Sequence, residues 1–151
     1  MAFQTPKTNW VSTDHFNISD WERVRGNLEF INHWFKVHNW PDSVLESMAT
    51  ARGINDLPTV DLINRLERNL SLIHSTTGIP ITEWRDSKVW YARLDAMYSA
   101  NPTYDDWNRW EELAKRLKES IDYVSTYLYQ RISGTFYSGN NYRIQLFSRG
   151  R

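Results

Sequence analysis

The sequence predicts a mostly α-helical protein: a helical bundle of about five helices that ends in a C-terminal β-hairpin. Three observations lead to this prediction. One capped amphipathic helix pattern occurs three times along the 151 residues. Each of the two linkers between the copies contains a shorter helical pattern. The residues from 132 onward alternate as strands do, around a Gly/Asn turn.

The three repeated segments align at offsets of 42 and then 44 residues. Asn17, Thr59 and Thr103 stand where an N-cap belongs, because their side-chain oxygens accept hydrogen bonds from the first free N–H groups of a helix. Acidic residues follow within the next turn of each copy. We therefore expect a capped helix to begin at each of these three positions.

An apolar stripe follows each cap at a spacing of three and four residues, which is typical of a helix packed nearly parallel to its neighbours. In the first copy the stripe is Trp21, Val24, Leu28, Ile31 and Phe35. In the second copy it is Ile63, Leu66, Leu70 and Ile73. In the third copy it is Trp107, Trp110, Ala114, Leu117, Ile121, Val124 and Leu128. The stripes predict three helices that share one core.

The linkers predict two shorter helices, which bring the bundle to about five. One runs from Pro41 to about Gly53, and the other from Pro80 to about Asn101 with Thr82 as its cap. One face of the second carries Trp90, Leu94 and Met97. We assign residues 1–131 to this helical domain.

The tail, residues 132–151, has the pattern of a β-hairpin. Aromatic and β-branched residues flank the turn at residues 138–140, and apolar and polar residues alternate after it. An isolated two-stranded hairpin is marginally stable in water, so we expect this one to pack on the bundle or on another subunit. The predicted interface residues are Phe136, Tyr137, Tyr142, Ile144, Leu146 and Phe147.

Composition weighs against several classes of function. Lysine plus arginine and aspartate plus glutamate both total 18, so the net charge is zero, and we expect no nucleic-acid partner. The sequence has no cysteine, no apolar stretch of the length that spans a membrane, and no apolar signal core at its N-terminus. We expect synthesis in a cytoplasm and no membrane partner.

The sequence contains no constellation that points to catalysis. None of the four histidines forms the i, i+4 pair with a nearby glutamate that a helical zinc site needs. Adjacent acids such as Asp105 and Asp106 diverge on a helix, and there is no glycine-rich phosphate loop. We expect a protein that is not an enzyme and that binds no metal or cofactor.

An arginine recurs at the same place in each repeat, as Arg23, Arg65 and Arg109. One interpretation is local, because an acid stands three or four residues before each arginine and pairs of this kind stabilise a helix. The other interpretation is that the three arginines bond across helices and set the register of the bundle. The pattern alone leaves both open.

The eight tryptophans allow two interpretations. Trp21, Trp107 and Trp110 lie on the apolar stripes and are expected in the core. Trp10, Trp40 and Trp84 lie at segment ends and are less constrained. Exposed indole faces stack on sugar rings, so a glycan-binding face is an alternative function.

Residues 7–24 resemble the opening of small minor structural and tail-associated proteins of phages and prophages of Gram-positive bacteria. That opening has a Lys-Thr-Asn-Trp stretch, as at residues 7–10, and then a Phe-Asn cap, as at Phe16 and Asn17. Residues 64–67, Asn-Arg-Leu-Glu, are similar to the helix that follows in that family, and residues 133–139 to its Ser-Gly-Thr-Phe-x-x-Gly ending. Copy one departs from the pattern at Glu22 and Gly26.

The resemblance implies a structural component of a phage tail, baseplate or fibre attachment, made in the host cytoplasm and carried in the virion. It implies other virion proteins as partners and several copies of the chain, and hence a homo-oligomer. Two alternatives stay open. One is a glycan-binding module for attachment to the host surface, and the other is a cytoplasmic adaptor or assembly chaperone absent from finished particles.

Overall fold

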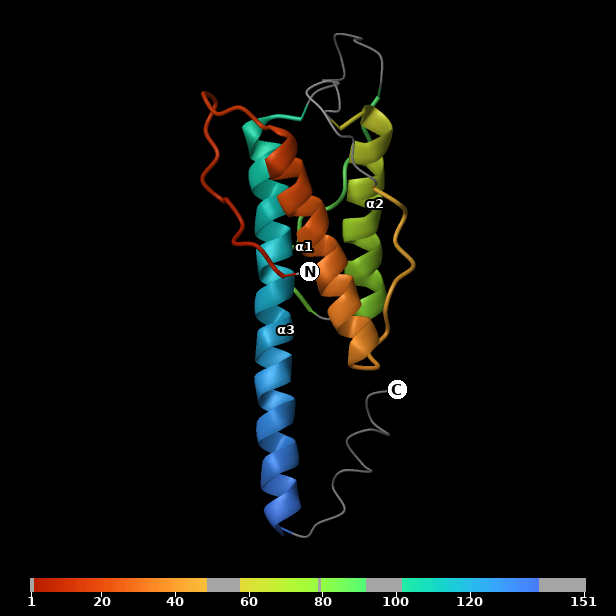
Figure 1. Cartoon of the computed structure of the whole chain (residues 1–151), viewed down its shortest axis with the longest axis vertical. Coiled ribbons are helices and arrows are strands. Elements are labelled where there is room, and N and C mark those ends of the chain that lie inside the picture. Colours follow the sequence, from red (N-terminus) through yellow and green to blue (C-terminus); the bar gives the residue numbers. More distant parts are fainter. Residues whose placement is uncertain (1, 49–57, 79, 92–101, 139–151) are drawn as a thin grey trace. The chain divides into compact units, whose positions relative to one another are not determined.

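The computed structural model describes residues 2–48, 58–78, 80–91 and 102–138, with side chains as far as residue 127. Within these ranges the chain forms three helices and no strand: α1 (Ile18–Val37), α2 (Val60–Thr77) and α3 (Tyr104–Ser138) (Figure 1). The prediction of a mostly helical protein is confirmed. The chain divides into two compact units, Met1–Leu117 and Lys118–Arg151.

The helices begin at the predicted caps. Asn17 forms a capping box with Asp20: its side chain accepts from the Asp20 N–H at 3.3 Å, and the Asp20 carboxylate accepts from the Asn17 N–H at 3.0 Å. Thr59 accepts from the Leu62 N–H at the start of α2. Thr103, just before α3, donates its N–H to the Asp106 carboxylate at 3.0 Å.

The apolar stripes form the core of the first unit. Every stripe residue of α1 and α2 is at most 5% exposed, as are Trp110, Ala114 and Leu117 of α3. Replacing one large side chain of such a core with alanine costs about 2–5 kcal/mol. Each large stripe residue therefore contributes substantially to the stability of this unit.

Within the first unit, α1, α2 and the start of α3 run in the same direction (Figure 1). A parallel arrangement requires each connection between helices to run back along their length. Extended segments meet this requirement more economically than helices, because a strand rises about 3.3 Å per residue and a helix 1.5 Å. The described parts of the connections, residues 41–48 and 80–91, are accordingly non-helical.

The prediction of two linker helices is wrong in the described residues. Residues 41–48 and 80–91 do not form helical hydrogen bonds, because asparagine side chains on the helices bind their backbone groups instead. The remainder of the two predicted helices, at residues 49–57 and 92–101, lies outside the described residues.

The first strand of the predicted hairpin is also wrong. Residues 132–138 belong to α3, which continues to Ser138. Extending an existing helix adds one hydrogen bond for each residue fixed, so the strand propensity of a short aromatic run does not stop it. The second predicted strand lies outside the described residues, and the proposed boundary between residues 131 and 132 falls inside α3.

Candidate functional site

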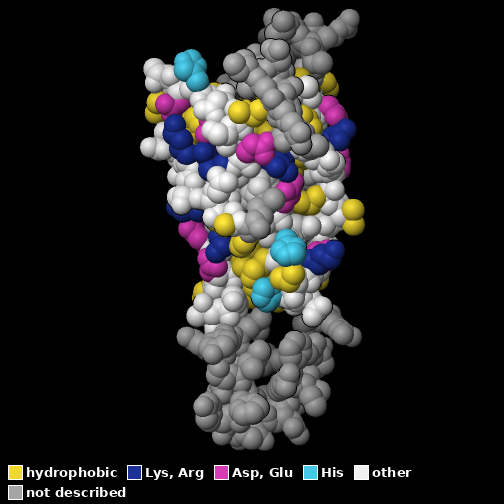
Figure 2. All heavy atoms as spheres, viewed as in Figure 1, with side chains coloured by type: hydrophobic (Ala, Val, Ile, Leu, Met, Phe, Trp, Pro, Cys, Tyr) yellow, Lys and Arg dark blue, Asp and Glu magenta, His cyan; other side chains and the backbone are white. Residues whose placement is uncertain are grey.

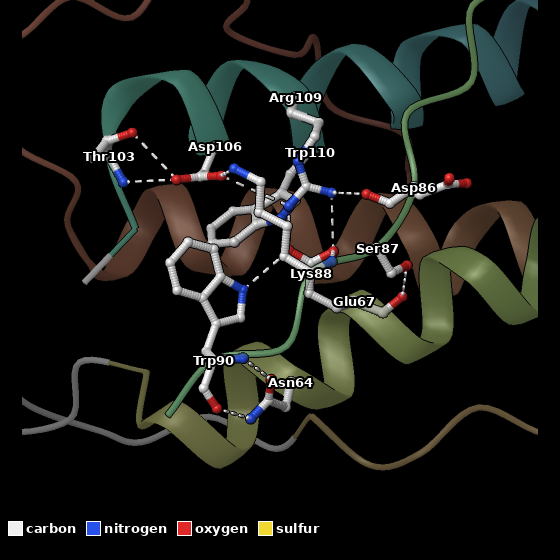
Figure 3. A network of polar contacts seen from close by, with 10 residues as sticks. All are labelled: Asn64, Glu67, Asp86, Ser87, Lys88, Trp90, Thr103, Asp106, Arg109 and Trp110. Atoms are coloured by element: carbon white, nitrogen blue, oxygen red, sulfur yellow. Dashed lines mark hydrogen bonds and ion pairs between the residues drawn. The ribbon is translucent and has the colours of Figure 1, made fainter. Parts of the chain in front are cut away.

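Arg109 on α3 and Glu67 on α2 form a buried ion pair, with side chains only 4% and 1% exposed (Figure 3). The Nη1 atom of Arg109 donates to Oε2 of Glu67 at 2.9 Å, and Nη2 donates to Oε1. A bidentate pair of this kind holds both groups in one relative orientation. It also compensates a carboxylate charge that would be costly to bury alone.

Glu67 receives further hydrogen bonds from two indoles and one backbone amide. Trp90 and Trp110 donate from Nε1 to its Oε1 at 3.1 and 2.9 Å, and the Lys88 N–H donates to Oε2 at 3.3 Å (Figure 3). Each carboxylate oxygen therefore accepts at least two hydrogen bonds, close to its capacity. A buried carboxylate in this state ties α2, α3 and the segment 80–91 together, and its oxygens have little capacity for a further hydrogen bond.

Asp106 extends the network toward the surface. Lys88 donates to its Oδ1 at 2.6 Å, and Arg109 approaches the same oxygen at 3.8 Å. Burial raises the pKa of Asp106, but the hydrogen bonds from Lys88 and the Thr103 N–H, with the charges of Lys88 and Arg109, outweigh it. The pKa of Asp106 consequently lies below its ordinary value of 3.8.

A second ion pair joins α1 to α3. Arg23 donates from Nε to Oε1 of Glu111 at 2.8 Å and from Nη2 to the same oxygen, while its Nη1 lies 2.9 Å from Asp20. The Glu111 side chain is fully buried. Burial raises the pKa of Glu111 above its ordinary value of 4.5, because the hydrogen bond and charge of Arg23 offset the lost hydration only in part.

Arg65, the third recurring arginine, bonds differently. It pairs with Asp61 at 2.8 Å within α2 and donates to the Ser47 carbonyl at 3.0 Å, and its side chain is 36% exposed. Arg23 and Arg109 thus bond to a glutamate on another helix, whereas the ion pair of Arg65 lies within its own helix. Each interpretation of the arginine pattern describes a part of what is observed.

Asparagine side chains fasten the extended segments to the helices. In five cases within the described residues, one asparagine accepts from the N–H and donates to the C=O of a single residue, at 2.7–3.0 Å. A side-chain amide can do this because it carries one acceptor and two donors. We call these contacts the asparagine clamps: Asn27 on Gln4, Asn32 on Ser43, Asn64 on Trp90, Asn69 on Glu46, and Asn108 on Trp10.

The tryptophans divide differently from the prediction. Trp10 is buried at 3% exposure, with its ring 5.3 Å from that of Trp107 and 5.6 Å from that of Phe16. Trp84 and Trp40 are half-buried: Trp84 stacks on His74 at 3.9 Å, and Trp40 donates from Nε1 to the Thr77 carbonyl. The lesser constraint expected for Trp10 is therefore wrong, because its clamp and its aromatic neighbours fix it.

In the second unit, the described side chains of α3 expose two tyrosines. Tyr123 is 73% and Tyr127 42% exposed, and their rings lie nearly parallel with centroids 6.4 Å apart. Of the predicted interface residues, Phe136 and Tyr137 lie in α3. The other four, Tyr142, Ile144, Leu146 and Phe147, lie outside the described residues.

The surface of the described residues mixes both signs of charge on the face seen in Figure 2. Among these residues, no group of three or more histidine or acidic side chains is arranged to hold a metal ion. No helix within the described ranges is both long enough and apolar enough to cross a membrane. Comparison with protein-family models, with curated proteins and with solved structures finds no match to this chain.

Sequence reasoning missed Glu67 and the asparagine clamps. A signal for Glu67 was present: it lies four residues after Ile63 and three before Leu70, which places a charge on the apolar stripe of its helix. A charge in that position needs a buried partner. The clamps leave a weaker signal, because asparagine is mostly exposed in proteins and nothing within its own helix shows that it bonds to a distant segment.

Proposed function

We propose that this chain is a non-enzymatic structural protein of a phage virion, a component of the tail, baseplate or fibre attachment that acts through protein–protein assembly. Residues 7–24, 64–67 and 133–139 resemble minor structural and tail-associated phage proteins, and this resemblance supports the assignment to a phage particle. The observation that carries the structural role is Glu67, whose buried carboxylate is fully used in holding the fold together.

The proposed contact region is the C-terminal part of the chain. Tyr123 and Tyr127 supply exposed aromatic surface on α3, and tyrosine is enriched in protein interfaces. The predicted interface residues follow these tyrosines in the sequence: Phe136, Tyr137, Tyr142, Ile144, Leu146 and Phe147. Other virion proteins and further copies of the same chain are its proposed partners, and zero net charge keeps repulsion between copies low.

The test is the protein content of purified particles. Virions from cells that carry the encoding phage or prophage are banded in a density gradient, and the chain is quantified by mass spectrometry against the major capsid protein. We expect the chain in the particle band at a fixed copy number. Its presence in the lysate and absence from the particles would contradict the proposal and favour the adaptor or assembly chaperone.

The glycan-binding alternative rests on the half-buried indoles Trp34, Trp40 and Trp84. A titration with cell-wall polysaccharide, followed by tryptophan fluorescence, separates it from the assembly proposal. A saturable change that is lost in Trp84→Ala and kept in Trp10→Phe would favour the glycan module.

A further inference from the structure

The sequence repeat extends beyond the helices into the segments that precede them. Three residues lie thirteen positions before the helix caps, namely Gln4, Glu46 and Trp90. An asparagine clamp holds each of them. For the first two, the clamping asparagine also stands at the same place, ten residues after the cap of the helix that follows. The repeating unit is therefore a module made of an extended segment and a helix.

Each segment joins its own helix to the preceding one. Segment 41–48 contacts α1 through the clamp on Ser43 and α2 through the clamp on Glu46. Segment 80–91 contacts α2 through Trp90 and α3 through the ion pair of Lys88.

Segment 2–17 also joins two helices, although no helix precedes it in the sequence. The clamp on Gln4 joins it to α1, its own helix, and the clamp on Trp10 joins it to α3. Since α3 takes the place of the preceding helix, the three modules close into a ring within the first unit.

The buried ion pairs obey the same cyclic order. The arginine six residues after a cap pairs with the glutamate eight residues after the cap of the preceding helix: Arg23 of α1 with Glu111 of α3, and Arg109 of α3 with Glu67 of α2. The third pair would join Arg65 of α2 to position 25 of α1. That position holds Arg25.

Local pairs take over where the third pair is missing. Arg25 bonds to Glu22 at 2.7 Å and to Glu29 at 2.6 Å, both within α1. Arg65 bonds to Asp61 within α2. The two arginines are thus neutralised separately.

We propose that the first unit is a closed ring of three equivalent segment–helix modules. A buried Arg–Glu pair joins α1 to α3 and another joins α3 to α2. The corresponding pair between α1 and α2 is missing because position 25 holds an arginine in place of a glutamate. In this ring Arg23 and Arg109 bond to the helix that precedes their own in the cyclic order, and Arg65 occupies the corresponding position in the third module. The absence of the third glutamate, and not a different orientation of α2, explains why Arg65 turns to Asp61.

The first experiment restores the missing acid. Two parent variants are made, and both carry Glu22→Gln and Glu29→Gln, which remove the present partners of position 25 within α1. The first parent also carries Arg25→Glu, and the second carries Arg25→Gln. Arg65→Met is then introduced into both, and the folding equilibrium constant is measured by urea denaturation. We expect the decrease in that constant caused by Arg65→Met to be at least roughly threefold larger in the Arg25→Glu background than in the Arg25→Gln background. Equal effects in the two backgrounds would overturn the proposal. Arg68→Met, whose partner is Glu46, is the control and should cost the same in both.

A second experiment needs no change in the core. The chain has no cysteine, so spin labels attach only at introduced sites. Ser19, Asp61 and Asp105 are exposed and stand two residues after their caps. Cysteine substitutions at these positions, taken in pairs in the full chain, give three distances by electron spin resonance. A ring predicts three similar distances, whereas one distance about twice the other two indicates a row of helices and contradicts the ring.

Discussion

Arg109 and Glu67 lie 42 residues apart in the sequence, and the two terminal nitrogens of the arginine donate to the two carboxylate oxygens of the glutamate. Two tryptophans and a backbone amide complete the shell around the carboxylate. Removing the carboxylate would take these hydrogen bonds from Arg109, the two indoles and the amide together, and would leave Arg109 with the Asp86 carbonyl at 3.3 Å and the Asp106 carboxylate at 3.8 Å.

Replacing Glu67 with glutamine should destabilise the chain by about 3–5 kcal/mol, because the change leaves the Arg109 charge buried without its counter-ion. The free energy of unfolding, measured by urea denaturation, tests this. Glu29→Gln is the control, since Glu29 is partly exposed in a helix-surface pair and its loss should cost about 0–1 kcal/mol. A similar loss for both variants would contradict the structural role of Glu67.

Replacing Arg109 with methionine should cost far more than replacing Arg65 with methionine. The two arginines occupy the same place in the repeat, but the partner of Arg109 is buried and that of Arg65 is 63% exposed. We expect about 3–5 kcal/mol for Arg109→Met and about 0–1 kcal/mol for Arg65→Met. The comparison is made on the midpoints and slopes of urea unfolding curves.

The buried carboxylate of Glu111 should make the chain more stable as the pH falls from 7 toward 5. Its pKa is raised in the folded state, so the folded chain binds this proton more readily than the unfolded chain does. The variant Glu111→Gln has no carboxylate at this position, so we expect it to lack this increase in stability at lower pH. Unfolding free energies at the two pH values, compared between the natural chain and this variant, isolate the effect, and an equal pH dependence of both would refute it.

Asp106 should have the opposite effect from Glu111: below about pH 4, the stability of the chain should decrease as Asp106 becomes protonated. Its pKa is depressed in the folded state, so its contribution to stability is complete above about pH 4 and is lost as the pH falls below that value. Lys88→Met removes the side-chain hydrogen bond and one of the two charges that lower the pKa of Asp106, and the acid-induced loss of stability should shrink. Acid titration followed by circular dichroism measures this loss, with Lys36→Met, on the exposed end of α1, as the control.

Removing an asparagine clamp should free a segment without unfolding the helices. In Asn64→Ala or Asn108→Ala the N–H and C=O of a tryptophan lose their partners, at a cost of about 1–3 kcal/mol. Hydrogen exchange should accelerate at Trp90 in the first variant and at Trp10 in the second. Asn9→Ala, at an exposed asparagine, should change neither.

The proposed assembly predicts a defined oligomer in solution. Light scattering after size exclusion should give a mass above that of one 18.0 kDa chain, and Tyr123→Ser with Tyr127→Ser should lower it. Val44→Ser, at a residue 92% exposed in segment 41–48, removes exposed apolar surface elsewhere and should leave the mass unchanged. A single-chain mass for the natural protein would count against the oligomer.

The sequence predicted those elements whose cause is local. The cap of Asn17 and the stripe from Trp21 to Phe35 depend on residues within one helix, and both were found as expected. The linkers were predicted wrongly because their conformation depends on distant side chains. Trp90 takes its backbone partners from Asn64, which no periodicity within the linker reveals.

The buried charges follow the same division. The pair of Arg65 with Asp61 was readable from i, i+4 spacing, whereas the contact of Arg23 with Glu111 spans 88 residues and needs the fold. A comparison of the repeats position by position would have aligned Glu67 with Glu111, and this is the signal that was available in advance.

The common direction of the three helices has an electrostatic consequence. Peptide dipoles that point the same way add together, so the end of the unit where all three helices begin carries the partial positive charge of three N-termini, about half a unit each. Antiparallel neighbours would cancel one another, but parallel ones repel. The first-turn carboxylates of Asp20, Asp61 and Asp106 lie at this end and supply the opposite charge. These three aspartates therefore reduce the repulsion between parallel helices that share one end.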